Sequence, residues 1–210
     1  IFVAKEAGER IISLKTSKDR WCPMLSEQEK RVMLRIARDS IARRLRLATG
    51  GELPPITPAM QEEQGVFVTL RKKGRLRGCI GNIEGRKPLH EAIADLALES
   101  AFGDPRFPAL TSGEFPEIDI EISVLTKLTK IEGIDQIEVG KHGLYIRKGF
   151  NSGLLLPQVA TEYGWDRRSF VEETCWKAGL PKDAWEKDAE IYIFGAEVFG
   201  EKELSNESAD

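Results

Sequence analysis

The stretch GVFVTLRKKGRLRGCIG, residues 65–81, decides the fold of this chain. Residues 66–70 are apolar or β-branched and predict a strand, and residues 75–80 predict a second one. Lys72-Lys73-Gly74 lies between them and predicts a tight turn. The stretch therefore predicts an antiparallel hairpin. Five basic side chains within residues 71–77 are interpreted as the exposed, charge-protected tip of that hairpin.

The second predicted strand ends in Leu76-Arg77-Gly78-Cys79-Ile80-Gly81. Because side chains alternate between the faces of a strand, Arg77 and Cys79 are expected on one face and the two apolar side chains on the other. With the apolar face against the core, a thiol and a guanidinium face outward. Gly78 and Gly81 would let the backbone bend or a ligand approach closely. The alternative is a buried structural cysteine beside turn glycines.

The composition is that of an ordinary globular protein. The chain has 210 residues, is 41% hydrophobic and 31% charged, and carries a formal net charge of -3. This length suits one domain or two joined lobes with a sizeable core. The slight negative charge argues against a protein built mainly for nucleic acid.

The cysteines and the hydropathy of the sequence indicate in which compartment the protein functions. Cys22, Cys79 and Cys175 lie far apart, which favours a reducing compartment over a disulfide framework. The sequence has no C-x-x-C or H-x-x-x-H pair, so we expect no metal and no cofactor. No apolar run approaches the ~20 residues that span a bilayer. We therefore expect a cytoplasmic protein that does not associate with membranes.

Helical spacing predicts two long helices around the hairpin. Ser26 and Glu29 form a capping-box pattern at the start of the first, which is expected to end at Gly50-Gly51. Residues 31–46 carry six arginines, interpreted as a solvated face, with phosphate binding as the alternative. The second helix is expected to end at Gly103.

The order of elements predicts the fold class. Hairpins are mixed with single helices and regular βαβ alternation is absent, so we expect an α+β fold with a mainly antiparallel sheet. Residues 1–25 are interpreted as an N-terminal arm, residues 26–200 as the domain and residues 201–210 as a frayed acidic tail. The other expected elements are strands at 118–124, 144–146, 154–156 and 191–198, and a helix at 167–178.

Charged residues elsewhere are candidates for the same site as Cys79. Asp104 and Arg106 stand in a loop stiffened by two prolines, either as an internal salt link or as one wall of a pocket. Glu121 alternates with apolar residues in a half-buried strand and would reach Arg77 if the two strands are neighbours. His142 lies between two glycines at the entrance of a strand.

Taken together, these segments resemble the AMMECR domain family, whose hallmark is the LRGCIG motif. One departure is Ala109, where the family pattern has a second proline. The resemblance covers about residues 26–200 in six ordered blocks: Leu76–Gly81, Asp104–Leu110, Glu121–Leu125, Gly140–Leu144, Gly153–Val159 and Phe170–Leu180.

The resemblance implies a fold and partners, but no reaction. It implies an α+β fold of two tightly joined lobes. Bacterial and archaeal members of the family are associated with a Memo-like protein and a radical SAM protein, which implies shared work on a substrate or a modification. Eukaryotic relatives have been suggested to serve transcription, translation or repair.

The first functional hypothesis is a covalent site at Cys79. Arg77 would favour the thiolate, and His142 would act as general base if the fold brings it close. The backbone N–H groups around Gly78 and Gly81 would hold an anion. Arg106 would bind a carboxylate or phosphate through paired hydrogen bonds.

Two other hypotheses do not involve catalysis, so whether the chain is an enzyme stays open. In one, a groove recognises a protein partner such as the Memo-like protein. In the other, the arginine-rich helix and the hairpin tip contact nucleic acid, which the acidic balance disfavours. The groove of the second hypothesis would consist of Arg77, Cys79, Asp104, Arg106 and Glu121.

Overall fold

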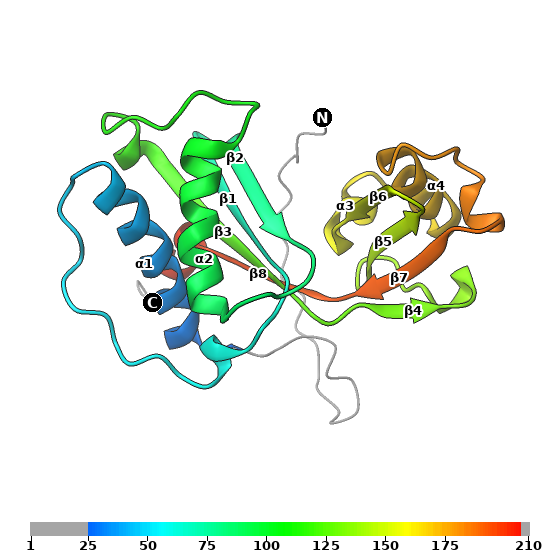
Figure 1. Cartoon of the computed structure of the whole chain (residues 1–210), viewed down its shortest axis with the longest axis horizontal. Coiled ribbons are helices and arrows are strands. Elements are labelled where there is room, and N and C mark those ends of the chain that lie inside the picture. Colours follow the sequence, from blue (N-terminus) through cyan, green and yellow to red (C-terminus); the bar gives the residue numbers. More distant parts are fainter. Residues whose placement is uncertain (1–24, 207–210) are drawn as a thin grey trace. The chain divides into compact units, whose positions relative to one another are not determined.

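The computed structural model describes residues 25–206 of the chain (Figure 1). These residues divide into two compact units. The hairpin unit contains residues 25–125 and 197–206, and the second unit contains residues 126–196. Each unit has its own four-stranded sheet and its own hydrophobic core. The expected N-terminal arm lies, apart from Leu25, outside the described residues.

The hairpin unit consists of helices packed on one sheet of order β2-β1-β3-β8. Strand β1 is antiparallel to both of its neighbours, β2 and β3. Helices α1 and α2 lie side by side on one face of this sheet (Figure 1). The elements are α1 (Glu27–Arg44), β1 (Val66–Lys72), β2 (Arg75–Asn82), α2 (Leu89–Leu98), β3 (Ile118–Leu125), β8 (Ala196–Gly200) and α5 (Glu201–Asn206). Short helical turns are Ala59–Gln61, Glu99–Gly103 and Phe115–Glu117.

The core of the hairpin unit lies between the sheet and its two long helices. Val66, Val68 and Leu70 alternate along β1 and are fully buried. They share a core with Ile41 of α1 and Ile93 of α2, which are also fully buried. Removing this much aliphatic surface from water is the main stabilising contribution to the unit.

Two local predictions from the sequence are confirmed. Lys73 and Gly74 have φ angles of 52° and 77°, and this pair of positive angles forms the tight turn between β1 and β2. At the start of α1, the Ser26 side chain accepts from the Glu29 N–H, and Glu29 accepts from the Ser26 N–H at 2.8 Å. This is the capping box that the sequence predicts.

Helix α1 ends earlier than the sequence predicts, at Arg44 rather than at the glycine pair. Arg46 takes a left-handed conformation with φ of 59°. Its N–H donates to the Arg43 carbonyl at 3.1 Å, and the Leu47 N–H donates to the Ala42 carbonyl at 2.9 Å. These two bonds form a Schellman termination, which satisfies the last helical carbonyls without a glycine.

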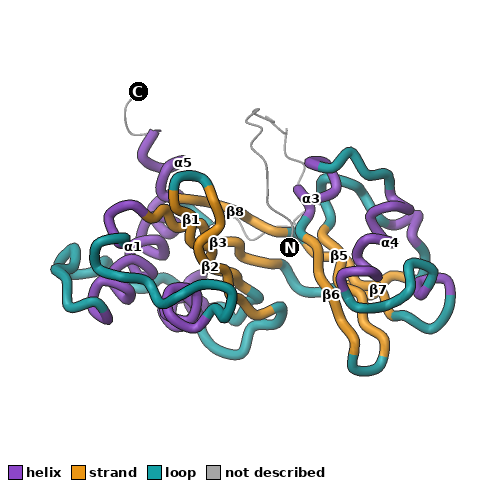
Figure 2. The backbone as a smooth tube through the Cα atoms, turned by 90° about the horizontal axis from the view of Figure 1, so that it is seen from above, coloured by secondary structure: helices purple, strands orange, loops and turns teal. Residues whose placement is uncertain are grey.

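The second unit is built around the sheet β4-β7-β5-β6, in which all pairs are antiparallel. Figure 2 shows β6, β5 and β7 of this sheet side by side. Helices α3 and α4 pack on the strands β5 and β6. Its core includes Ile146, Phe170 and Cys175, all fully buried. The elements are β4 (Thr129–Ile131), β5 (Gly143–Lys148), β6 (Asn151–Leu155), α3 (Pro157–Glu162), α4 (Arg167–Lys177) and β7 (Glu190–Phe194). Short helical turns are Ile134–Gln136 and Ala184–Glu186.

This architecture confirms the predicted α+β class with mainly antiparallel sheets. The prediction of a frayed tail is wrong for residues 201–206, which form α5. Leu204 of α5 is 5% exposed and belongs to the core of the hairpin unit. Glu201 pairs with Arg38 of α1. An apolar side chain and an ion pair thus anchor this acidic segment, which is why it does not fray.

Candidate functional site

A β-bulge sets the geometry of the Leu76–Gly81 segment. Leu70 of β1 pairs with Gly78, but the next residue, Arg71, pairs with Leu76. Arg77 is therefore the extra residue of the bulge, and side-chain alternation shifts at this point. Leu76 consequently lies on the same face as Cys79, and Arg77 is only 7% exposed. The expectation that Arg77 and Cys79 face outward together is wrong.

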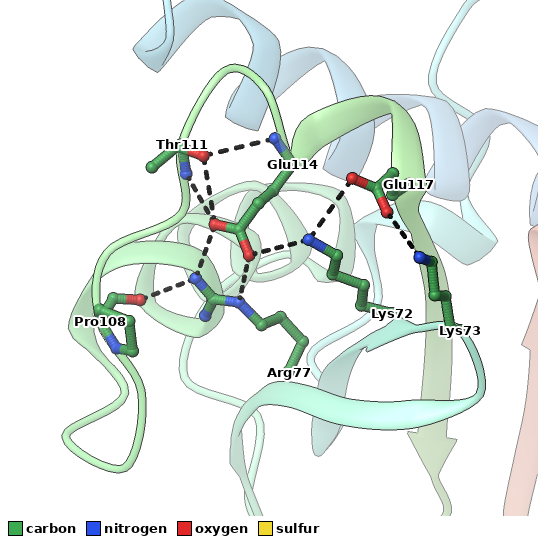
Figure 3. Close-up of polar contacts among 7 residues, drawn as sticks. All are labelled: Lys72, Lys73, Arg77, Pro108, Thr111, Glu114 and Glu117. Carbon is green, nitrogen blue, oxygen red and sulfur yellow. Dashed lines mark hydrogen bonds and ion pairs between the residues drawn. The ribbon is translucent and has the colours of Figure 1, made fainter.

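Arg77 binds the loop that follows α2 instead of flanking the thiol (Figure 3). Its Nε and Nη2 donate to the two oxygens of the Glu114 carboxylate, each at 3.2 Å. Nη2 also donates to the Pro108 carbonyl at 2.9 Å. The Arg77 guanidinium, and then the Thr111 N–H, lower the pKa of Glu114 to about 2. The charge of Arg77 is therefore compensated within the fold.

Glu121 pairs with a different arginine from the one expected. Its Oε1 lies 3.6 Å from Nη2 of Arg71, one strand away. In the sheet register, Thr69 of β1 stands between Cys79 of β2 and Glu121 of β3. These three residues form one row on the sheet face opposite Val66, Val68 and Leu70, the core residues of β1. The structure thus places Glu121 on the face of Cys79 but not beside Arg77.

Asp104 and Arg106 hold the main chain of Cys79. The Cys79 N–H donates to Asp104 Oδ2 at 2.9 Å, and Arg106 Nη2 donates to the Cys79 carbonyl at 3.1 Å. Arg106 Nε and Nη2 also donate to the Asp104 carboxylate at 2.9 and 2.6 Å. These bonds from Arg106 hold the pKa of the nearly fully buried Asp104 far below its ordinary value. Of the two interpretations left open by the sequence, the internal salt link is the one observed.

Ser100 is a residue of the site that sequence reasoning missed. Its hydroxyl accepts from the Ile80 N–H at 2.9 Å and donates to the Val68 carbonyl at 2.8 Å. The hydroxyl therefore links the main chains of β1 and β2. A Cβ on Gly78 would lie 2.1 Å from the Ser100 carbonyl oxygen, so this position requires glycine. The available signal was a polar residue that continues the apolar stripe of α2 into the turn Glu99–Gly103.

The thiol of Cys79 is half-buried and hydrogen-bonded. The Thr69 hydroxyl donates to its Sγ at 3.3 Å. Thr69 itself is 7% exposed, so the sheet holds this donor in place. At Gly81 a Cβ would lie 2.3 Å from atoms of the Phe67 ring, so the ring of the neighbouring strand fills the space above the glycine.

His142 belongs to the second unit, whereas Cys79 belongs to the hairpin unit. Its ring is 2% exposed, and Nδ1 accepts from the Glu138 N–H at 3.1 Å. This bond places the proton of the neutral ring on Nε2. Burial lowers the pKa of His142. Within its own unit, His142 is a buried, neutral imidazole that orders the turn before β5.

The described residues contain neither a cluster of metal ligands nor a membrane-crossing helix. Nowhere in residues 25–206 do three His, Cys, Asp or Glu side chains gather as metal ligands would. Within the same range, no helix combines the length and the apolar character that a membrane crossing requires.

Comparisons with known proteins find many archaeal relatives. Protein MK0488 of Methanopyrus kandleri is 46% identical over 189 residues, covering 85% of this chain and 91% of that protein. A protein of Methanothermobacter thermautotrophicus is 45% identical over 185 residues, covering 84% and 96% of the two chains. The crystal structure of the uncharacterized protein PH0010 from Pyrococcus horikoshii shares the fold. It has a TM-score of 0.72 and 44% identity, and it covers 81% of this chain and 90% of that one.

The resemblance seen in the sequence is confirmed by a family model. The AMMECR1 model matches residues 34–199, which include the bulged strand, the loop that holds it and all of both sheets except Gly200. The chain belongs to the AMMECR1 family.

Proposed function

We propose that the Leu76–Gly81 segment forms a functional site in which Cys79 acts as a nucleophile or covalent ligand site. The observation that carries the proposal is the hydrogen bond from Thr69 Oγ1 to Cys79 Sγ at 3.3 Å. A hydroxyl aimed at the sulfur holds the nucleophilic atom of the cysteine in one position. Thr69, and not Arg77, is thus the polar side chain that contacts the thiol.

The main chain at Cys79 supports this proposal. Asp104 and Arg106 fix the N–H and the carbonyl of Cys79, so that little freedom remains in the backbone that carries the thiol. Preorganisation of this kind is what a site needs in order to present a nucleophile in one orientation. The Arg106 side chain is itself 41% exposed, so its remaining N–H groups are accessible to an anionic part of a substrate.

A non-catalytic interaction module is the alternative function. It is favoured by the pairing of Arg77 with Glu114, because this pairing removes the cation that was expected to activate the thiol. In this alternative, the row of Cys79, Thr69 and Glu121 is part of a surface for a protein partner, such as a Memo-like or radical SAM protein. The thiol then only packs in the interface.

Alkylation of the full chain under native conditions tests the covalent site. Iodoacetamide at pH 7.5, followed by mass spectrometry of the peptides, gives separate rates for Cys79 and Cys175. Cys175 is fully buried in α4, and burial raises its pKa, so it is the internal control. We expect Cys79 to react at least tenfold faster. Equal, slow rates at both cysteines would remove the proposal.

The alternative predicts a different pair of results. If the surface serves only recognition, capture of a purified Memo-like partner is lost on Glu121→Lys and kept on Cys79→Ser. If Cys79 forms a covalent bond, Cys79→Ser abolishes the mass adduct formed with an electrophilic substrate analogue. Glu121 is half-buried, and its ion pair with Arg71 is long, so this substitution is expected to leave the fold intact.

A further inference from the structure

The hairpin unit contains a second concave site that does not involve Cys79. A cavity of about 400 Å³ lies between α1, residues 48–50, the turn at Phe115 and α5. None of the residues that hold Cys79 lines it. A volume of this size is typical of pockets for small molecules.

Much of the cavity wall is apolar. Leu34 and Ala42 come from α1, and Leu204 comes from α5. All three are at most 5% exposed, so they belong to the ordered core of the unit. Phe115 lines the cavity below the Arg38 guanidinium, whose carbon lies 5.0 Å from the centre of the ring. Such walls favour a ligand with an apolar body.

Three of the charged groups at the cavity, Arg38, Glu201 and Asp39, already have partners within the protein. Arg38 donates to the carboxylate of Glu201 and, through Nη2, to the Ile118 carbonyl at 2.9 Å. Asp39 is buried and accepts from the Gly50 N–H at 3.1 Å. These groups are satisfied by the protein itself and need no ligand.

Two arginines of α1, Arg35 and Arg31, could still interact with a ligand. Arg35 Nη2 donates to the Gly50 carbonyl, but its Nε is buried and has no hydrogen-bond acceptor among the described residues. That Nε forms an ion pair with Asp39 Oδ2 at 3.6 Å, a separation longer than a hydrogen bond. Arg31, one turn earlier on the same face of α1, is exposed and forms no ion pair with any residue in the range 25–206.

The cavity therefore has three arginines against two carboxylates, which leaves one positive charge. Arg31 carries this charge and is exposed, so an anion can reach it, and Arg35 lies one turn away in the same wall. We propose that this cavity binds a monoanionic amphiphile, with a carboxylate at Arg31 and Arg35 and an apolar body against Leu34, Ala42 and Leu204. A fatty acid and an aromatic acid share this chemistry.

Calorimetric titration of the full chain tests the proposal with three probes. Octanoate represents the fatty acids, 3-phenylpropanoate represents the aromatic acids, and octan-1-ol has the apolar body without the charge. From the size of the probes we expect dissociation constants of about 0.1–1 mM for at least one acid. The alcohol is expected to bind at least about tenfold more weakly. The acid that binds more tightly indicates whether the ligand is a fatty acid or an aromatic acid.

Three variants locate the site. Arg31→Gln keeps most of the side-chain length but removes the charge, and is expected to weaken binding of the preferred acid about fivefold to tenfold. Ala48→Trp fills the mouth of the cavity and is expected to abolish binding. The matched control is Arg75→Gln, because Arg75 is also exposed but lies at the hairpin turn. Circular dichroism confirms that each variant is folded.

The proposal is overturned by any one of three results. These are no saturable binding of either acid up to 10 mM (~tenfold above the expected range), equal affinity for the alcohol, and unchanged affinity in both Arg31→Gln and Ala48→Trp. A Cys79→Ser chain is expected to bind the acid as the original chain does. A failure at the cavity thus leaves the proposed role of Cys79 unaffected.

Discussion

Asp104 accepts a hydrogen bond from the main-chain N–H of Cys79 at 2.9 Å, although the two residues lie 25 positions apart in the chain. Strand β2 is at the edge of its sheet, where main-chain groups normally face solvent or an unwanted strand. Asp104 and Arg106 occupy these groups at Cys79. These hydrogen bonds occupy the main-chain groups of Cys79 that an added strand would otherwise pair with. They also fix the main chain that carries the thiol.

Asp104→Asn is expected to destabilise the protein by about 2–3 kcal/mol, because it leaves Arg106 without its buried carboxylate partner. Urea unfolding measures the change, and hydrogen exchange is expected to show faster exchange at the Cys79 N–H. The control is Asp95→Asn, whose carboxylate pairs with Lys87 in solvent. Similar effects of both variants would contradict a special role for Asp104.

The ion pair of Glu114 with Arg77 predicts how stability depends on pH. The pKa of Glu114 is lowered from 4.5 to about 2, so its contribution is present above pH 4.5 and is lost as the pH falls towards 2. Glu114→Gln is expected to lower the free energy of unfolding by about 1–2 kcal/mol at pH 7, since the carboxylate is partly screened by solvent. Unfolding of both chains at several pH values should show this difference shrinking below pH 4.5. A difference independent of pH would argue against the pairing.

Gly78→Ala is expected to destabilise the protein by more than about 2 kcal/mol. A Cβ there would lie 2.1 Å from the Ser100 carbonyl oxygen, and a main-chain atom cannot move aside as a flexible side chain can. Gly113→Ala is the matched control, because nothing lies within 4 Å of a Cβ at that position. Thermal unfolding of the two variants compares them directly, and equal melting temperatures would refute the close approach.

Thr69→Val keeps the shape of the side chain but removes the donor to Cys79 Sγ. We expect the alkylation rate of Cys79 at pH 7.5 to fall about threefold to tenfold, because the sulfur loses the hydrogen bond that orients it. The rate at Cys175 serves as the internal reference and is expected to stay unchanged. If Cys79 reacts as fast in this variant, the Thr69 hydroxyl has no part in its reactivity.

Several features of the fold were accessible from local patterns alone. The capping box at Ser26 and the turn at Lys73-Gly74 depend on residues within a few positions of one another, and both are observed. Alternation of apolar residues likewise located β3. The end of α1 was misplaced because an arginine, Arg46, takes the left-handed conformation that the prediction reserved for glycine.

The sequence by itself determined the α+β class, the hairpin and the position of the family motif, because periodicity, caps and turns are local properties. Only the tertiary structure decided which groups meet at the motif. The β-bulge turns Arg77 toward Glu114, 37 positions away, and leaves Cys79 beside Thr69. A prediction from strand periodicity assumes regular pairing. One extra residue in β2 was therefore enough to give Arg77 a partner that the sequence did not indicate.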